Sequence, residues 1–150
     1  IAYVIIAAEN DPVLLEIIRN GFNDLKKIFS LLGAEEVFLI EQKNISYLYS
    51  AQIVIFSGGD TSFLIKVLKN KNFTKKIQNH SLGIGAVMGI SAGAIALFEK
   101  GVGTKDKKEC LFDGLGLISG TVVVHSNEEL EKKYPKAIHL KEYKLYQDGN

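Results

Sequence analysis

The sequence contains very little cysteine, since Cys110 is the only one among 150 residues. A single cysteine excludes a disulfide within the chain, and it leaves no group of Cys and His residues with the spacing of a zinc site. Proteins with so few thiols and no disulfide are typical of a reducing compartment. We therefore predict a cytoplasmic protein.

Long apolar runs and an excess of one charge are also lacking. The longest uninterrupted apolar run covers residues 1–8, which is less than half of the ~20 residues that a membrane-spanning helix needs. Lys and Arg number 18 against 17 Asp and Glu, and the two signs are interspersed along the chain. This balance gives no electrostatic footprint for nucleic acid or for a membrane surface. We expect a soluble protein with neither as a partner.

The chain also has no internal repeat, low-complexity segment or Pro/Ser-rich linker that would divide it. Its composition, 47% apolar and 23% charged, is that of an ordinary globular protein. We therefore predict one domain over residues 1–150. Because the chain begins without Met inside a strand-like run and stops at the turn signature Asp148-Gly149-Asn150, we expect residues to be missing at both ends.

Apolar runs typical of buried strands alternate with segments of helical spacing along the whole chain. Asp11 is predicted to cap the first helix, with Pro12 at its first position. Predicted strands cover residues 1–8, 37–40, 53–56, 84–90 and 122–125, and predicted helices cover 12–32, 61–68, 92–98 and 128–134, with a short helical piece near residue 47. Repeated βα units imply an α/β fold with a doubly wound, mostly parallel sheet and helices on both faces.

Ligands bind to such a sheet outside the carboxyl ends of its strands. Three of the predicted strand ends carry residues that could do chemistry. They are Ser57-Gly58-Gly59-Asp60-Thr61, Gly89-Ile90-Ser91-Ala92-Gly93 and His125-Ser126-Asn127.

Ser91 lies in the pattern Gly-x-Ser-x-Gly between an apolar strand and an Ala-rich helix. That pattern is typical of a nucleophile elbow, where a sharp strand-to-helix turn exposes the serine Oγ. The alternative is a glycine-rich turn in which Ser91 only caps the helix. We predict that Ser91 is a catalytic nucleophile.

The double glycine at residues 58 and 59 opens the helix after another strand, so its backbone N–H groups can face an anion. Beside an elbow, the N–H groups of Gly59 and Ala92 would form an oxyanion hole. An ordinary turn capped by Asp60 or Thr61 is the alternative interpretation.

His125 is the best placed of three histidines to act as the base of the serine, because it ends an apolar strand at the expected edge of the sheet. The alternative is a solvated histidine at a strand end. His80 precedes its strand, and His139 is expected in an edge strand. The carboxylates that could orient His125 are Glu128, Glu129, Glu142 and Asp148, and the residues alone do not rank them.

Cys110 lies in the polar segment 105–113, away from any strand-to-helix turn. We interpret it as an incidental thiol. The lysines at positions 105, 107 and 108 are interpreted as part of a solvated loop.

Taken together, the strand ends resemble those of peptidase E and its relatives, serine hydrolases with a class I glutamine amidotransferase-like fold. The resemblance rests on Gly58-Gly59-Asp60-Thr61 followed by spaced leucines, on Gly89-Ile90-Ser91-Ala92-Gly93-Ala94, and on Gly114-Leu115-Gly116-Leu117-Ile118 before His125. It implies that Ser91 is the nucleophile, that His125 is the base and that the Gly59 and Ala92 N–H groups form the oxyanion hole.

The resemblance also assigns the acidic residue of a catalytic triad to Glu142, although Glu142 follows His125 at a shorter distance than in the family. Asp60 stands where the family has Asn, which keeps a helix cap and adds a negative charge near the oxyanion site. The family's strand before residue 1 and its strands after the acid are missing, so the domain is expected to lack its first strand and its C-terminal end.

We therefore predict a serine peptidase that needs no metal or cofactor. A glutamine amidotransferase is disfavoured because it would carry cysteine at the elbow, and an α/β-hydrolase because its triad runs serine, acid, histidine. The resemblance implies cleavage of short peptides after an N-terminal aspartate. We expect only a modest preference, because the sole arginine, Arg19, is expected at the surface of a helix. The alternative is a catalytically silent relative that binds a small acidic metabolite in the same cleft.

Overall fold

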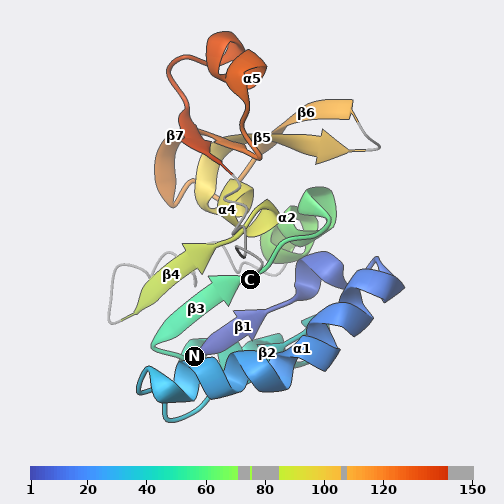
Figure 1. Cartoon of the computed structure of the whole chain (residues 1–150), viewed down its shortest axis with the longest axis vertical. Helices are drawn as coiled ribbons and strands as arrows, with labels where there is room; N and C mark the ends of the chain where they lie inside the picture. Colours follow the sequence, from blue (N-terminus) through green and yellow to red (C-terminus); the bar gives the residue numbers. More distant parts are fainter. Residues whose placement is uncertain (71–74, 76–84, 106–107, 142–150) are drawn as a thin grey trace, which may run out of the picture.

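The computed structural model describes residues 1–70, 75, 85–105 and 108–141, which form two four-stranded sheets (Figure 1). The first sheet has the order β2-β1-β3-β4 and is entirely parallel. Its strands are β1 (Ala2–Val4), β2 (Phe38–Ile40), β3 (Ile53–Phe56) and β4 (Ala86–Gly89). The chain moves from β1 outward to β2 and then returns to β3 on the other side of β1. This reversal makes the carboxyl ends of β1 and β3 a topological switch point, where α/β proteins bind ligands.

Three helical elements connect or follow these strands. The helix α1 (Pro12–Leu31) links β1 to β2, the 3₁₀ segment η2 (Gln42–Ser50) links β2 to β3, and α2 (Thr61–Asn70) follows β3. The Asp11 side chain accepts hydrogen bonds from the N–H groups of Val13 and Leu14, as predicted for the α1 cap. Local helix signals therefore fix where α1 begins.

The second sheet has the order β6-β5-β7-β8. Its strands β5 (Phe98–Lys105) and β6 (Lys108–Asp113) are antiparallel, whereas β7 (Ile118–Val124) runs parallel to β5 and β8 (Ile138–Leu140) parallel to β7. The short helix α5 (Glu128–Lys133) connects β7 to β8. The helix α4 (Ala92–Leu97) lies between the two sheets (Figure 1). Because β5 begins directly where α4 ends, no connecting loop brings it back beside β4, and the strands divide into two sheets.

The α/β class and the mostly parallel pairing predicted from the sequence are confirmed. Two local predictions were wrong. The predicted strand over residues 1–8 ends at Val4, and Ile6–Ala8 form a 3₁₀ turn, η1, that is as deeply buried as a central strand. Lys105 and Lys108, which were predicted to lie in a solvated loop, are instead the last residue of β5 and the first residue of β6, and Lys107 lies outside the described residues. In β6, half-buried Cys110 and Phe112 alternate with exposed neighbours.

The hydrophobic core joins residues from both sheets with residues of α2 and α4. Every residue of α4 is buried, which explains why this helix consists of Ala, Gly, Ile and Leu. Phe56 of β3, Leu64 and Leu68 of α2 and Ile95 of α4 are among the largest fully buried side chains. Burying an aliphatic side chain of this size stabilises a fold by about 1.5–3 kcal/mol. The α4 helix therefore has a fixed position, and with it the turn that precedes it.

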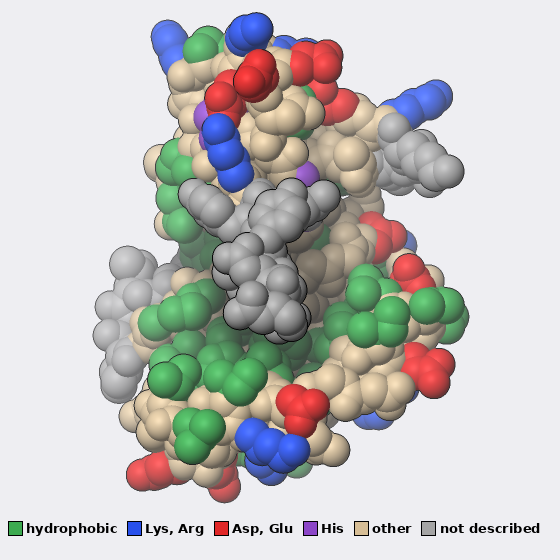
Figure 2. All heavy atoms as spheres, in the orientation of Figure 1, with side chains coloured by type: hydrophobic (Ala, Val, Ile, Leu, Met, Phe, Trp, Pro, Cys, Tyr) green, Lys and Arg blue, Asp and Glu red, His purple; other side chains and the backbone are tan. Residues whose placement is uncertain are grey.

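The helix α1 has no fully buried residue, and its hydrophobic side chains Val13, Ile17, Ile28 and Leu31 are exposed. Figure 2 shows hydrophobic side chains over the part of the molecule that holds the first sheet and α1, and charged side chains of both signs over α5. Among the described residues, no helix is both long and apolar enough to cross a membrane.

Candidate active site

Ser91 and His125 come together from the two different sheets. Ser91 follows β4 of the first sheet and precedes α4, whereas His125 follows β7 of the second sheet. The Ser91 Oγ lies 2.8 Å from His125 Nε2, which is a hydrogen bond. Ser91 is half-buried and His125 is exposed, so solvent reaches the pair. The two residues that the sequence places at separate strand ends are therefore hydrogen-bonded neighbours.

The backbone at Ser91 makes a sharp turn, with φ 51° and ψ −111°. The flanking glycines make this turn possible. A Cβ on Gly89 would lie 2.5 Å from Ala94 N, and one on Gly93 would lie 2.3 Å from Phe56 O. The Ser91 side chain makes no capping hydrogen bond to α4. Ser91 thus has the backbone geometry of an elbow serine, and its side chain does not cap the helix.

The double-glycine loop after β3 packs between η1 and Ser91. Gly59 has φ +135°, and a Cβ there would lie 2.3 Å from Ala7 O. A Cβ on Gly58 would lie 3.3 Å from Ser91 Cβ. Within the described part of the chain, the N–H groups of Gly59 and Ala92 donate to no protein acceptor. Two backbone donors therefore remain available beside the serine. The close approach of Gly58 to Ser91 was not predicted, although the double glycine in the sequence is the signal that could have indicated it.

Asp60 caps α2. Its Oδ1 accepts a hydrogen bond of 2.9 Å from Phe63 N, and its Oδ2 accepts a long one of 3.5 Å from Asn10 Nδ2. The Asp60 N–H donates to Ala7 O at 2.6 Å. The carboxylate is exposed, so its negative charge is screened by water.

The predicted acidic partner of His125 is not among the described residues, because Glu142 and Asp148 both lie outside them. Glu128 and Glu129 are exposed in the first turn of α5, and no hydrogen bond or ion pair joins either one to His125 in the described part. His139 lies in the edge strand β8, as expected. The sequence did not predict the hydrogen bond between the His139 ring and Ser126, the residue next to His125.

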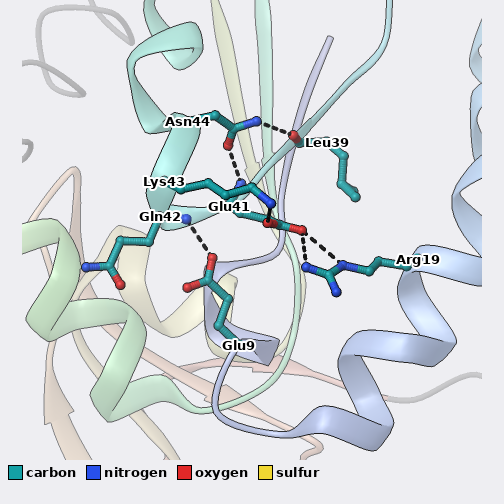
Figure 3. A network of polar contacts seen from close by, with 7 residues as sticks. All are labelled: Glu9, Arg19, Leu39, Glu41, Gln42, Lys43 and Asn44. Carbon is teal, nitrogen blue, oxygen red and sulfur yellow. Dashed lines mark hydrogen bonds and ion pairs between the residues drawn. The ribbon is translucent and has the colours of Figure 1, made fainter.

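Arg19 forms an ion pair with Glu41 at the carboxyl end of β2 (Figure 3). Its Nε and Nη2 atoms donate to Glu41 Oε1 at 3.0 and 2.5 Å, and Lys43 Nζ lies 2.6 Å from Glu41 Oε2. The hydrogen bond from Lys43 lowers the pKa of Glu41 below its ordinary value. Burial raises this pKa, but the hydrogen bond and the charge of Arg19 lower it further. The only guanidinium in the chain is therefore occupied by a buried carboxylate. The Arg19 side chain is 47% exposed, in agreement with the predicted surface position.

No group of three or more His, Cys, Asp or Glu side chains within the described ranges could hold a metal ion. The arrangement at Ser91 and His125 instead has the parts of acyl transfer: a hydroxyl on a sharp turn, an imidazole within hydrogen-bond distance, and backbone N–H groups beside them.

The chain matches the model of peptidase family S51 over residues 1–146. Its fold is similar to the crystal structure of a candidate peptidase E protein from Listeria monocytogenes EGD-e, with a TM-score of 0.62 and 16% identity, covering 94% of this chain and 76% of that one. It is also similar to the structure of a peptidase from an acI-B1 actinobacterium, with a TM-score of 0.60 and 22% identity, covering 82% of this chain and 52% of that one. The curated proteins contain no significant match.

These matches confirm the resemblance to peptidase E. Because the family match extends over nearly the whole chain, this protein belongs to peptidase family S51 and is a serine peptidase.

Proposed function

We propose that the protein hydrolyses short peptides through an acyl-enzyme, with Ser91 as nucleophile and His125 as base. The observation that carries this proposal is the 2.8 Å hydrogen bond between Ser91 Oγ and His125 Nε2. A nucleophilic serine needs a base at this distance, because the neutral hydroxyl attacks a carbonyl poorly until its proton is removed.

In the first step, the Ser91 Oγ attacks the peptide carbonyl carbon while its proton moves to His125 Nε2. The carbonyl oxygen becomes an oxyanion, which accepts hydrogen bonds from the N–H groups of Gly59 and Ala92. The tetrahedral intermediate collapses as His125 donates the proton to the leaving amine. A water molecule then attacks the acyl-enzyme, with His125 again as base, and releases the acid and free Ser91.

A carboxylate on the other ring nitrogen, Nδ1, would orient His125 and stabilise its cation. We assign this role to Glu142. The strand β8 runs parallel to β7 with Leu140 paired to Val124, the residue before His125. The chain therefore reaches the His125 end of the sheet two residues before Glu142. Neither Glu128 nor Glu129 has a comparable position.

For the substrate, we propose dipeptides and tripeptides with a modest preference for an N-terminal aspartate, which peptidase E-like relatives prefer. Arg19 is occupied by Glu41, so an arginine is not available to bind the substrate carboxylate in a bidentate manner. The exposed carboxylate of Asp60 adds a repulsive charge close to the double-glycine loop, which solvent screening keeps weak. Backbone N–H groups or a lysine would have to bind the aspartate side chain, and a weak preference follows.

Peptide hydrolysis measured with Asp-Leu, Asn-Leu and Ala-Leu tests the proposal. The wild type is expected to cleave all three, with the highest kcat/KM for Asp-Leu, and Ser91→Ala is expected to cleave none. Equal kcat/KM values would remove the aspartate preference. Turnover of none of them by the wild type would favour a silent relative that binds a small acidic metabolite in this cleft.

A further inference from the structure

A second serine and histidine lie directly behind His125. The Oγ of Ser126 is 2.7 Å from His139 Nδ1, and His139 Nε2 is 3.0 Å from the carbonyl oxygen of Tyr134. Ser126 and His139 are both half-buried, whereas Ile138 and Leu140, the neighbours of His139 in β8, are exposed. The ring of His139 therefore bridges the end of α5 and the end of β7.

The direction of both hydrogen bonds follows from the chemistry of the partners. A carbonyl oxygen only accepts, so His139 Nε2 must carry the hydrogen and donate it to Tyr134. In the neutral ring, Nδ1 is then an acceptor, and the Ser126 hydroxyl donates to it. One tautomer of His139 satisfies both contacts, so the Ser126 hydroxyl has a defined direction.

These contacts bear on His125 because Ser126 follows it in the chain. The Ser126 N–H also donates to Leu140 O at 3.1 Å, which extends the β7–β8 pairing one step beyond His125. On the other side, Val124 is buried and pairs with Leu140. His125 thus lies between Val124 and Ser126, both of which are paired with Leu140 of β8.

The backbone of His125 needs such support, because it has φ 52°. A residue with a Cβ in this left-handed region is strained by about 1–3 kcal/mol and persists there only when its surroundings impose it. If Ser126 were free to move, His125 could relax to an ordinary φ, and its ring would turn away from Ser91. The position of Nε2 therefore depends on what binds Ser126.

We propose that Ser126 and His139 are positioning residues that keep the His125 ring in hydrogen-bond distance of Ser91. The inference rests on the proposed role of His125 as base. Ser126 has neither the positive φ nor the double-glycine loop that surrounds Ser91, so the second pair acts through His125 and not as a second nucleophile.

The test compares Ser126→Ala, which removes the hydroxyl, with Ser126→Thr, which keeps it. The matched control is Ser119→Ala, because Ser119 is exposed on β7, the strand that leads to Ser126, and makes no side-chain hydrogen bond in the described part. We expect Ser126→Ala to lower kcat at least about tenfold with KM changed less than about twofold, since misplacing a catalytic group acts on the chemical step. Ser126→Thr should recover most of the activity, and Ser119→Ala should leave it unchanged.

Two further measurements separate positioning from general stability. Long-range ¹H–¹⁵N spectra of the histidine rings should show His139 with its hydrogen on Nε2 in the wild type. The melting temperature of Ser126→Ala should remain within a few degrees of the wild type. The proposal is overturned if Ser126→Ala retains the wild-type kcat, or if kcat and Tm fall together and Ser126→Thr rescues neither.

Failure of this inference and failure of the proposed function give different results. If Ser91→Ala is inactive while Ser126→Ala is as active as the wild type, the catalytic pair stands and only the positioning role is wrong. If Ser91→Ala keeps the wild-type rate, the proposed function itself is wrong, and the positioning role is overturned with it.

Discussion

Ser91 and His125 are joined by a 2.8 Å hydrogen bond and are also the two non-glycine residues with positive φ in the described part of the chain, at 51° and 52°. Such backbone conformations are strained, and they concentrate at functional sites where neighbouring structure imposes them. At Ser91 the imposing structure is the glycine-flanked turn into buried α4. At His125 it is the pairing of β7 with β8. The strain in this fold is therefore located at the two residues proposed to do the chemistry.

Replacing Gly58 by alanine should impair catalysis more than folding. The new Cβ would lie 3.3 Å from Ser91 Cβ, so the serine must shift by a few tenths of an ångström. Since a displacement of 1 Å lowers a rate about 100-fold, we expect kcat to fall roughly 3–10-fold. Gly21→Ala is the control, because nothing lies within 4 Å of a Cβ there. It should keep full activity and raise stability by about 0.5–1 kcal/mol in the interior of α1. Equal kcat values for the two variants would contradict this prediction.

Replacing Gly59 by alanine should instead destabilise the fold. Its φ of +135° is strained for alanine, and the Cβ would overlap Ala7 O at 2.3 Å. We expect a loss of more than about 2 kcal/mol, seen as a fall in Tm of at least ~5 °C. Gly120→Ala has a positive φ of +99° but nothing within 4 Å, so it isolates the backbone strain from the clash. It should lose only about 1 kcal/mol. If Gly59→Ala were as stable as Gly120→Ala, this prediction would be wrong, because η1 would be able to move away from the added Cβ.

Glu142→Gln should lower kcat by several orders of magnitude with little change in KM, because an orienting carboxylate acts mainly in the transition state. Glu128→Gln is the matched control, since Glu128 is exposed and makes no hydrogen bond or ion pair with His125 in the described part. Steady-state kinetics with the best dipeptide substrate measures both. A fully active Glu142→Gln variant beside an inactive Glu128→Gln variant would transfer the role to α5.

Glu41→Gln should destabilise the protein near neutral pH but not in acid. Lys43 and Arg19 lower the pKa of Glu41 in the folded state, so the carboxylate stabilises the fold above its unfolded pKa, and this contribution is lost as the pH falls through the folded value. At pH 7 we expect a loss of about 1.5–3 kcal/mol, typical of a hydrogen bond to a charged group. The difference from the wild type should shrink below about pH 4.

Thermal unfolding from pH 7 to pH 3 measures this difference, with Glu16→Gln as control. Glu16 is exposed on α1 and makes no ion pair in the described part of the chain, so its variant should follow the wild type at every pH. A constant difference between Glu41→Gln and the wild type across the range would contradict the ion-pair interpretation.

Much of this fold could be predicted because β3 and β4 are short apolar runs followed by glycines, and α2 has apolar residues at helical spacing after the Asp60 cap. The 3₁₀ turn at Ile6–Ala8 could not, since full burial produces the same continuous apolar pattern in a turn as in a central strand. The strand β6 was missed because Glu109, Leu111 and Asp113 on one of its faces are exposed and two of them are charged, so the segment lacks the continuous apolar character of a buried strand.

The site could be predicted in part for a comparable reason. Ser91 and His125 each carry a local signal at a strand end, so the sequence predicts that they meet, although their strands belong to two different sheets and not to one. The contact between Ser126 and His139 depends on the register between β7 and β8, which no short motif encodes. The role of Gly58 depends on how closely two loops from different strands approach.

The most direct test of the central proposal is labelling with a serine-directed fluorophosphonate, followed by mass spectrometry of the adduct. The reagent reacts with a serine only when a base activates it. We predict one adduct, on Ser91, in the wild type, and strongly slowed labelling in His125→Gln. The absence of an adduct on Ser91, while a known serine hydrolase in the same tube is labelled, would contradict the assignment of Ser91 as the nucleophile.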